Sequence, residues 1–140
     1  MSEEKMKIEQ LTFPDEFHYH PEHTWVKVKS EEVFIGISDF AQDQLGEIVY
    51  VDLPNVGDSL AGGEIFGIVE SAKSASSLYL PISGEILAVN ANVVDSPELV
   101  NQDPYGEGWM IALKVQDSAE IRNLMSKEEY VNYLKDTQDP

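Results

Sequence analysis

The 140-residue sequence contains no cysteine, few basic residues and no long hydrophobic run. Without cysteine there are no disulfides, no thiolate metal ligands and no thiol nucleophile. Nine lysine and arginine residues stand against 26 aspartates and glutamates, and the formal net charge is −17. This charge repels the phosphate backbone of nucleic acids and anionic membrane surfaces. The composition therefore argues against nucleic acid and membranes as partners and favours basic protein surfaces.

No apolar stretch is long enough to cross a bilayer, and the opening MSEEKMKIEQL lacks the apolar core of a secretion signal. A hydrophobic content of 42% suits a folded domain of moderate size. We therefore expect one soluble, cytoplasmic domain over residues 18–136. Residues 1–17 are charged and weakly periodic, which predicts a mobile N-terminal arm, and residues 137–140 form a short tail.

Short β-rich segments separated by turn residues dominate the chain. They lie at residues 24–29, 32–37, 47–53, 64–70, 78–81, 85–90 and 109–115. Many short strands at close spacing predict a mainly β, antiparallel sandwich or flattened barrel.

Short helices are predicted at the ends of this β body. Ser38 and Gly46 have the residue types of an N-cap and a C-terminal glycine. Ser96, followed by proline, is typical of another helix start. Residues 126–129 spell the S-x-x-E capping box, and the final helix then has an apolar stripe that we expect to face the core, formed by Tyr130, Tyr133 and Leu134.

Lys73 stands in a run of small side chains, VESAKSASS, at residues 69–77. Similar segments lie on either side of it, VGDSLAGGE and PISGE, and each leads into a β-rich strand, so Lys73 is predicted at a hairpin tip. A nucleophilic lysine needs an apolar pocket or a neighbouring cation, whereas its nearest charge is Glu70. The pattern leaves two interpretations, a covalent attachment site and an ordinary solvated lysine.

Several motifs, in order, resemble the glycine cleavage system H-protein family over about residues 18–136. They are HTWV (23–26), IGISDFAQDQLG (35–46), VYVDLP (49–54), ESAKSAS (70–76), YLPISGEILAVN (79–90) and SPELVNQDPYGEGW (96–109). The resemblance places Lys73 at the family's lipoyl lysine. It also implies that Glu70 and Gly84, which lies eleven residues after Lys73, are recognition points for the lipoylating enzyme.

The resemblance implies a biotinyl/lipoyl hammerhead-type β-sandwich that is not itself an enzyme. Lipoate, attached by a lipoate ligase or synthase, would form an amide with the Lys73 amine and act as a swinging arm between enzymes. Biotin is the competing group, but biotin sites resemble Met-Lys-Met, whereas Ala72 and Ser74 flank this lysine.

Four residues are implied to form the cargo cleft, namely His23, Thr24, Ser77 and Leu80, and three of them depart from the family pattern. The family has glutamate at the position of Thr24, an acid at that of Ser77, and usually alanine or serine at that of Leu80. Those acids hold the ammonium of the aminomethyl cargo, and burying an unpaired ammonium is costly. Glu22 and Glu70 are the candidate substitutes.

These departures favour a related group, the lipoate-binding proteins of sulfur oxidation, which work with a heterodisulfide-reductase-like complex and carry a sulfur cargo. The alternative is the aminomethyl carrier of glycine cleavage, whose partners are glycine decarboxylase, aminomethyltransferase and dihydrolipoyl dehydrogenase. A third interpretation is an unmodified scaffold of the same fold.

Two other clusters of polar residues have simpler explanations than chemistry. His18, His20 and His23 have a spacing that zinc or nickel could use, but His23 already belongs to the family pattern, so we expect no metal. The carboxylates between residues 95 and 107 fit helix caps and turns better than acid–base catalysis. They are Asp95, Glu98, Asp103 and Glu107.

Overall fold

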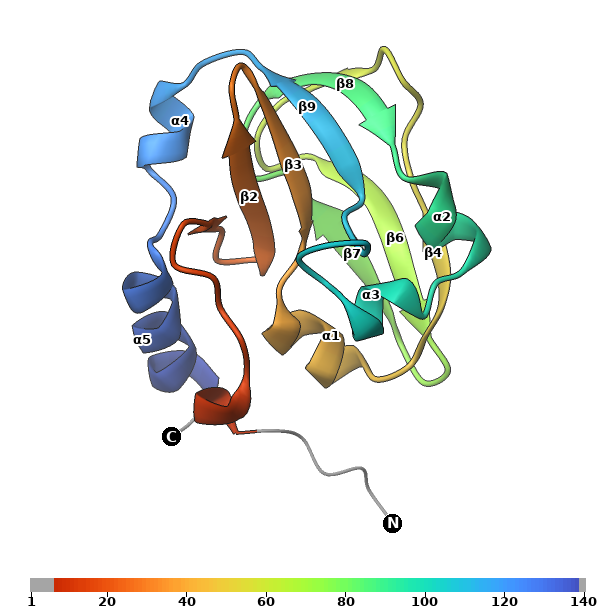
Figure 1. The fold of residues 1–140 in the computed structure, drawn as a ribbon, viewed down its shortest axis with the longest axis vertical. Helices are drawn as coiled ribbons and strands as arrows, with labels where there is room; N and C mark the ends of the chain where they lie inside the picture. The colour runs from red at the N-terminus through yellow and green to blue at the C-terminus, as the bar shows by residue number, and fades with distance from the viewer. Residues whose placement is uncertain (1–6, 139–140) are drawn as a thin grey trace.

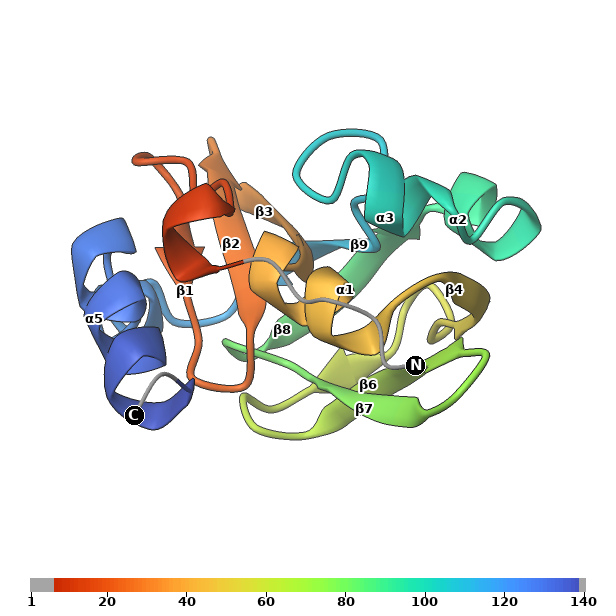
Figure 2. The same cartoon turned by 90° about the horizontal axis from the view of Figure 1, so that it is seen from below.

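The computed structural model describes residues 7–138 and has two antiparallel β-sheets with short helices at their ends (Figures 1 and 2). The strands are β1 (His18–Tyr19), β2 (Thr24–Lys29), β3 (Glu32–Ile37), β4 (Ile48–Asp52), β5 (Ser59–Leu60), β6 (Ile65–Ser71), β7 (Ala75–Tyr79), β8 (Gly84–Val89) and β9 (Ile111–Val115). The helices are the 3-10 turn η1 (Ile8–Gln10), α1 (Asp39–Leu45), α2 (Ala91–Asp95), α3 (Leu99–Gln102), α4 (Ala119–Arg122) and α5 (Lys127–Gln138).

One sheet has six strands in the order β1-β2-β3-β9-β8-β5, and the other has three in the order β4-β6-β7. The mainly β prediction is confirmed, and the sheets stay open rather than closing into a barrel. Buried aliphatic side chains from both sheets form the main core, among them Val26, Ile35, Val69, Leu78, Leu80, Ile86 and Leu113. Because β7 is an edge strand of the smaller sheet, its free side can border a cleft.

The predicted caps of α1 are confirmed. The Ser38 hydroxyl accepts a hydrogen bond from the Ala41 N–H at 3.2 Å, and Gly46 ends the helix with φ of 85°. The capping box before α5 is also present, since the Ser126 and Glu129 side chains each accept the other's backbone N–H. These local patterns fix the ends of the helices that border the site.

The helix start predicted at Ser96 is wrong. Ser96 is instead the C-cap residue of α2, and α3 begins only at Leu99. Helix α2 was not predicted. Its N-cap is Asn90, whose side chain accepts a hydrogen bond from the Asn92 N–H at 3.1 Å. A capping asparagine directly after a strand was the available signal.

The mobile arm predicted over residues 1–17 is wrong for residues 7–17, which pack against the domain; residues 1–6 lie outside the described part. We call residues 7–17 the N-terminal strap. Its apolar side chains join a second core with Trp25, Phe40 and the last helix, listed in full as Ile8, Leu11, Phe13, Phe17, Tyr19, Trp25, Phe40, Tyr130 and Leu134. Burying one such side chain stabilises the folded state by about 1.5–3 kcal/mol. The apolar residues therefore hold this segment on the domain despite its many charged residues.

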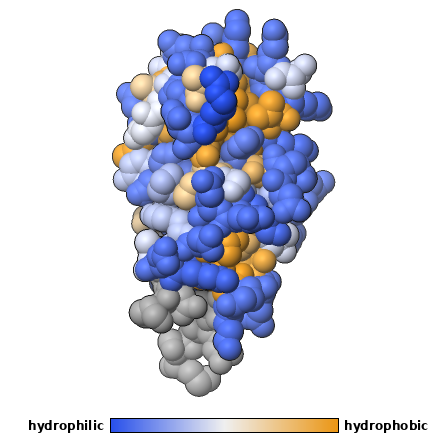
Figure 3. Space-filling view, turned by 90° about the vertical axis from the view of Figure 1, so that its left-hand side faces the viewer, coloured by the Kyte–Doolittle hydropathy of each residue, from blue (hydrophilic) through white to orange (hydrophobic). Residues whose placement is uncertain are grey.

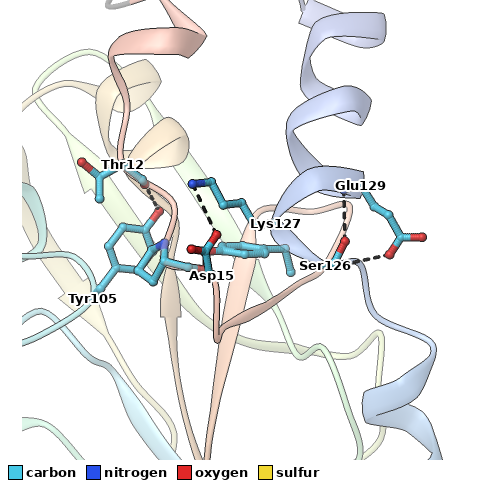
Figure 4. Close-up of polar contacts among 8 residues, drawn as sticks. Thr12, Asp15, Tyr105, Ser126, Lys127 and Glu129 are labelled. Carbon is cyan, nitrogen blue, oxygen red and sulfur yellow. Dashed lines mark hydrogen bonds and ion pairs between the residues drawn. The ribbon is translucent and has the colours of Figure 1, made fainter.

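Polar contacts also tie the strap to the domain (Figure 4). The Tyr105 hydroxyl donates to the Thr12 carbonyl at 2.7 Å and accepts from the Asp39 N–H at 2.9 Å. The Thr12 N–H donates to Asp39 Oδ2 at 2.8 Å, and Lys127 lies 3.5 Å from Asp15. Because Asp39 is the first residue of α1, the strap is fixed to the start of that helix.

Candidate functional site

Lys73 lies at the exposed tip of the β6–β7 hairpin, where the sequence analysis predicted it. The last strand pair is Glu70 opposite Ala75, and the four residues between them, Ser71, Ala72, Lys73 and Ser74, form the turn. Figures 1 and 2 show this hairpin beside α1.

Ser71 organises the hairpin turn. Its N–H donates to the Ser74 carbonyl at 2.8 Å, and its hydroxyl oxygen accepts from the Ser74 N–H at 3.2 Å. Ser71 is only 7% exposed, so the hydrogen bonds that hold the turn lie on its buried side. The solvent-exposed side carries only small neighbours of Lys73, namely Ala72 and Ser74. An acylating enzyme could therefore enclose Lys73 without steric conflict.

A cleft of about 270 Å³ opens between α1 and the edge strand β7. Its lining combines apolar walls with a few polar groups: Glu22, His23, Ile37, Phe40, Ala41, Gln44, Leu45, Val69, Ser76, Ser77 and Leu78. By strand alternation Ser76 shares the inner face with Val69, whereas Ser77 shares the outer face with Ile68. Both serines border the cleft because β7 has no neighbour on that side.

His23 is held at this cleft by the last helix. Its Nδ1 lies 2.8 Å from the Tyr130 hydroxyl, which lies 2.8 Å from the Ser38 hydroxyl. His23 adopts φ of 75°, and its ring packs 5.1 Å from that of Phe40. Burial lowers the pKa of His23, against an opposing effect of Glu22, so the imidazole is neutral at pH 7.

The proton positions in this chain of hydrogen bonds follow from the available donors and acceptors. The Ser38 side-chain oxygen accepts a hydrogen bond from the Ala41 N–H, and the Ser38 hydroxyl proton is available to donate to the Tyr130 oxygen. Burial raises the pKa of Tyr130 well above its usual range, so the phenol stays protonated and donates a hydrogen bond to His23 Nδ1. His23 is thereby assigned the tautomer with its proton on Nε2.

The structure brings together two of the four predicted cleft residues, His23 and Ser77. Thr24 is 1% exposed and its hydroxyl donates to the Tyr79 carbonyl at 3.2 Å. Leu80 is fully buried in the main core. Neither lines the cleft, whereas Glu22 does, and it supplies the one carboxylate among the described lining residues.

The two predicted recognition residues lie in different sheets. Glu70 is exposed on β6, three residues before Lys73. Gly84 is buried on β8, and a Cβ there would clash with the Lys114 carbonyl and the Leu113 side chain. The packing of β8 against β9 therefore explains this glycine, and enzyme recognition by Glu70 and Gly84 stays a prediction.

The histidines and carboxylates have structural partners. His18 pairs with Val26 between β1 and β2, and His20 Nδ1 accepts from the Glu22 N–H at 3.0 Å. Within residues 7–138 no three histidine, aspartate or glutamate side chains are grouped to hold a metal ion. Asp103 caps a turn, with Oδ2 accepting from the Glu107 N–H at 3.0 Å.

The model of one protein family, the glycine cleavage H-protein, matches residues 17–137. The chain belongs to this family. The glycine cleavage system H protein of Carboxydothermus hydrogenoformans is 49% identical over 123 residues, which cover 88% of this chain and 95% of that protein. The H protein of Bacillus licheniformis is 48% identical over 126 residues, covering 90% and 99%.

A solved structure agrees. The crystal structure of the H protein from Mycobacterium marinum has a TM-score of 0.80 and 34% identity, and it covers 86% of this chain and 97% of that one. Proteins of the glycine cleavage H-protein family are non-catalytic carriers with lipoate covalently attached to a lysine. Lipoate fits this chain, which offers an exposed lysine among small residues beside a partly apolar cleft.

The comparisons support the alternative function over the preferred one. The relatives are named as glycine cleavage proteins, and nothing in them supports a sulfur-oxidation carrier or a heterodisulfide-reductase-like partner. Among the helices of residues 7–138, none combines the length and apolar character needed to cross a membrane.

Proposed function

We propose that this chain is the aminomethyl carrier of glycine cleavage, with lipoate amide-linked to Lys73. The observation that carries the proposal is the composition of the cleft beside the hairpin. Glu22 and His23 lie there, while two of the three departures from the family, Thr24 and Leu80, fall in the protein interior. A sulfur cargo was favoured because the cleft was expected to lack a counter-ion, and Glu22 supplies one.

The hairpin and the cleft are close enough to work together. Ser76 and Ser77 are three and four residues from Lys73 along β7, which corresponds to about 10–13 Å at the rise of a β-strand. A lysyl stem extended by an acyl chain can therefore fold back from the tip into the cleft. Lipoate, when bound, would supply the dithiolane, whose S–S bond opens when the cargo is taken up and which is left as the dithiol once the cargo is released.

The residues of the chain hold and shield the cargo. Phe40, Leu45 and Val69 give the cleft apolar walls that exclude water from the arm. The Glu22 carboxylate is the anionic partner for the cargo's ammonium, because a positive charge in a partly dry cleft needs one. His23 is neutral and held by Tyr130, so it brings no positive charge that would compete with the cargo's ammonium for the Glu22 carboxylate.

The proposed partners follow from this role. Glycine decarboxylase loads the arm, aminomethyltransferase unloads it, and dihydrolipoyl dehydrogenase reoxidises the dithiol, after a lipoate ligase or synthase has modified Lys73. Tethering makes each delivery intramolecular and so raises the effective concentration of the cargo. The net charge of −17 is suited to brief encounters with basic docking surfaces.

The test is glycine-dependent loading of the lipoylated protein by glycine decarboxylase, followed by intact mass. We expect the aminomethyl mass on the wild type and no lipoylation or loading of Lys73→Arg. If the wild type carries lipoate but stays empty while the Carboxydothermus protein loads, the glycine-cleavage assignment is wrong.

Glu22→Gln tests the counter-ion separately. We expect the loaded arm of this variant to lose its cargo about tenfold faster, since one charge-assisted hydrogen bond contributes roughly 1.5–3 kcal/mol. Glu85→Gln is the matched control, because Glu85 is exposed on β8 of the other sheet and lies outside the cleft lining. Equal release rates for the two variants would remove Glu22 from the cargo site.

A further inference from the structure

The outer face of the three-stranded sheet carries large apolar side chains that no other part of residues 7–138 covers. Tyr50 on β4 is 49% exposed, and Ile65 and Ile68 on β6 are 52% and 39% exposed. We call these three residues the outer apolar face. On a β-strand, exposed positions of this kind are normally polar.

The strand register places these residues on the side away from the core. Val51 pairs with Val69 and both are buried. The flanking pairs, Tyr50 with Glu70 and Asp52 with Ile68, therefore point outward, and Tyr50 is a diagonal neighbour of Ile68. The cleft lies along the free edge of β7 and includes Val69 of the inner face, whereas the outer apolar face is on β4 and β6 and is turned away from the core.

The surroundings of the outer apolar face are acidic. Asp52 and Glu70 are the strand partners of Ile68 and Tyr50, and Glu64 directly precedes Ile65; all three acids are exposed. Lys73 is the one basic residue between positions 30 and 113 of the sequence. An apolar centre with a rim of one charge sign is the arrangement of a protein docking surface, and here the complementary rim is basic.

We propose that the outer apolar face is the docking site of the enzyme that acylates Lys73, and that this enzyme presents an apolar centre with a lysine- and arginine-rich rim. β6 runs from Ile65 and Ile68 through Glu70 directly to the hairpin tip, so a protein seated there reaches Lys73 along one rigid strand. It also leaves the cleft side of the hairpin free. The inference rests on the proposed attachment to Lys73 and does not depend on the cargo.

The enzyme that attaches the acyl group meets an unmodified chain, so it has no arm to grip. Recognition must then come from the protein surface next to Lys73, and the outer apolar face adjoins the hairpin that carries Lys73. Enzymes that act on the loaded arm must instead draw it from the cleft, at the free edge of β7. This difference assigns the outer apolar face to acylation.

The experiment measures lipoylation of the unmodified chain by a lipoate ligase with ATP and lipoate, using intact mass. Ile68→Thr and Tyr50→Thr keep the strand propensity of the positions while removing apolar area. Leu87→Thr is the matched control, since Leu87 is 37% exposed on β8 of the other sheet, against 39% for Ile68. Circular dichroism and melting temperature establish that all three variants fold.

We expect each outer-face variant to raise KM about tenfold with kcat unchanged, as for a central interface residue, while Leu87→Thr behaves as the wild type. The double variant Asp52→Asn, Glu64→Gln should flatten the rise of KM with added salt. Normal lipoylation of the outer-face variants would overturn the proposal. If these variants then fail to load with glycine decarboxylase, the face docks that enzyme instead. If the wild type is a dimer and the variants are monomers, the face joins two copies of the chain. Wild-type lipoylation that Lys73→Arg abolishes tests the attachment site on its own.

Discussion

Tyr130 connects the final helix to both His23 and Ser38 through one hydroxyl group. Tyr130→Phe keeps the ring, which stacks 4.8 Å from Tyr19, and removes only these two hydrogen bonds. We expect it to lower the free energy of unfolding by about 1–3 kcal/mol, because two buried polar partners lose their bond. Urea denaturation measures this, with Tyr133→Phe as the control on the same helix; equal stability of both variants would show that the hydroxyl chain contributes nothing.

His23 makes stability depend on pH in a defined direction. Its pKa is lowered in the folded state, chiefly by burial, while Glu22 acts in the opposite sense and His20 adds to the lowering. Near pH 6.5 the unfolded chain therefore binds more protons than the folded chain does. The contribution of His23 to the free energy of unfolding is fully present above that pH and is lost as the pH falls below it.

We expect His23→Asn to reduce this slope between about pH 7 and 5, since asparagine tolerates the positive φ but does not titrate there. His20, whose pKa is also lowered by burial, supplies part of the remaining slope. Urea midpoints across this pH range provide the measurement, and parallel curves for variant and wild type would contradict the assignment.

At the scale of elements, the strap and α1 share Tyr105. Tyr105→Phe removes the contacts to the Thr12 carbonyl and the Asp39 N–H, whereas Asp15→Asn removes only the surface ion pair with Lys127. We expect the first to cost about 1–2 kcal/mol and to speed hydrogen exchange at the Thr12 amide, and the second to change stability by less than about 1 kcal/mol. Hydrogen exchange of the strap amides is measured for both variants. If Tyr105→Phe speeds exchange no more than Asp15→Asn does, the strap is held by its apolar side chains alone.

Most strands and the caps of α1 and α5 could be predicted because their signals are local. The period-two alternation of residues 24–29 and the Ser38 and Gly46 pair needed no tertiary information. β5, only two residues long, was missed because it forms through pairing with β8, a contact far along the chain.

The strap was mispredicted for a different reason. The charge of the strap can be read from its own residues, whereas Phe13 packs on Tyr130 and Phe17 on Tyr105, both far along the chain.

The position of Lys73 at a hairpin tip could be predicted from one short segment, whereas the lining of the cleft is assembled from residues far apart in the chain. Lys73 was recognisable from its small neighbours and from the motif around it. Glu22 lies two positions from Thr24, yet only the structure shows that the former lines the cleft and the latter is buried. Sequence alignment alone assigns cargo residues by position, and a turn such as the one at His23, with φ of 75°, changes which neighbour faces the cleft.

The whole molecule is dominated by its negative charge. Figure 3 shows a mostly hydrophilic face over α4 and α5 with smaller apolar patches. A net charge of −17 on 140 residues favours the expanded chain by self-repulsion, which salt screens over about 10 Å at 0.1 M. We expect the melting temperature to rise between about 20 mM and 300 mM NaCl, and a falling melting temperature in scanning calorimetry would contradict this. Glucose at matched osmolality is the control for non-ionic effects.

The second core joins the beginning of the chain to its end, since Phe13 and Tyr19 pack on Tyr130. A ribosome delivers the N-terminal segments first, and domains begin to fold as they emerge. All residues of the β6–β7 hairpin, Lys73 included, are therefore synthesised before Tyr130. His23 gains its tyrosine partner only after α5 has been made, so the cleft that receives the arm is finished later than the segment that carries the attachment point.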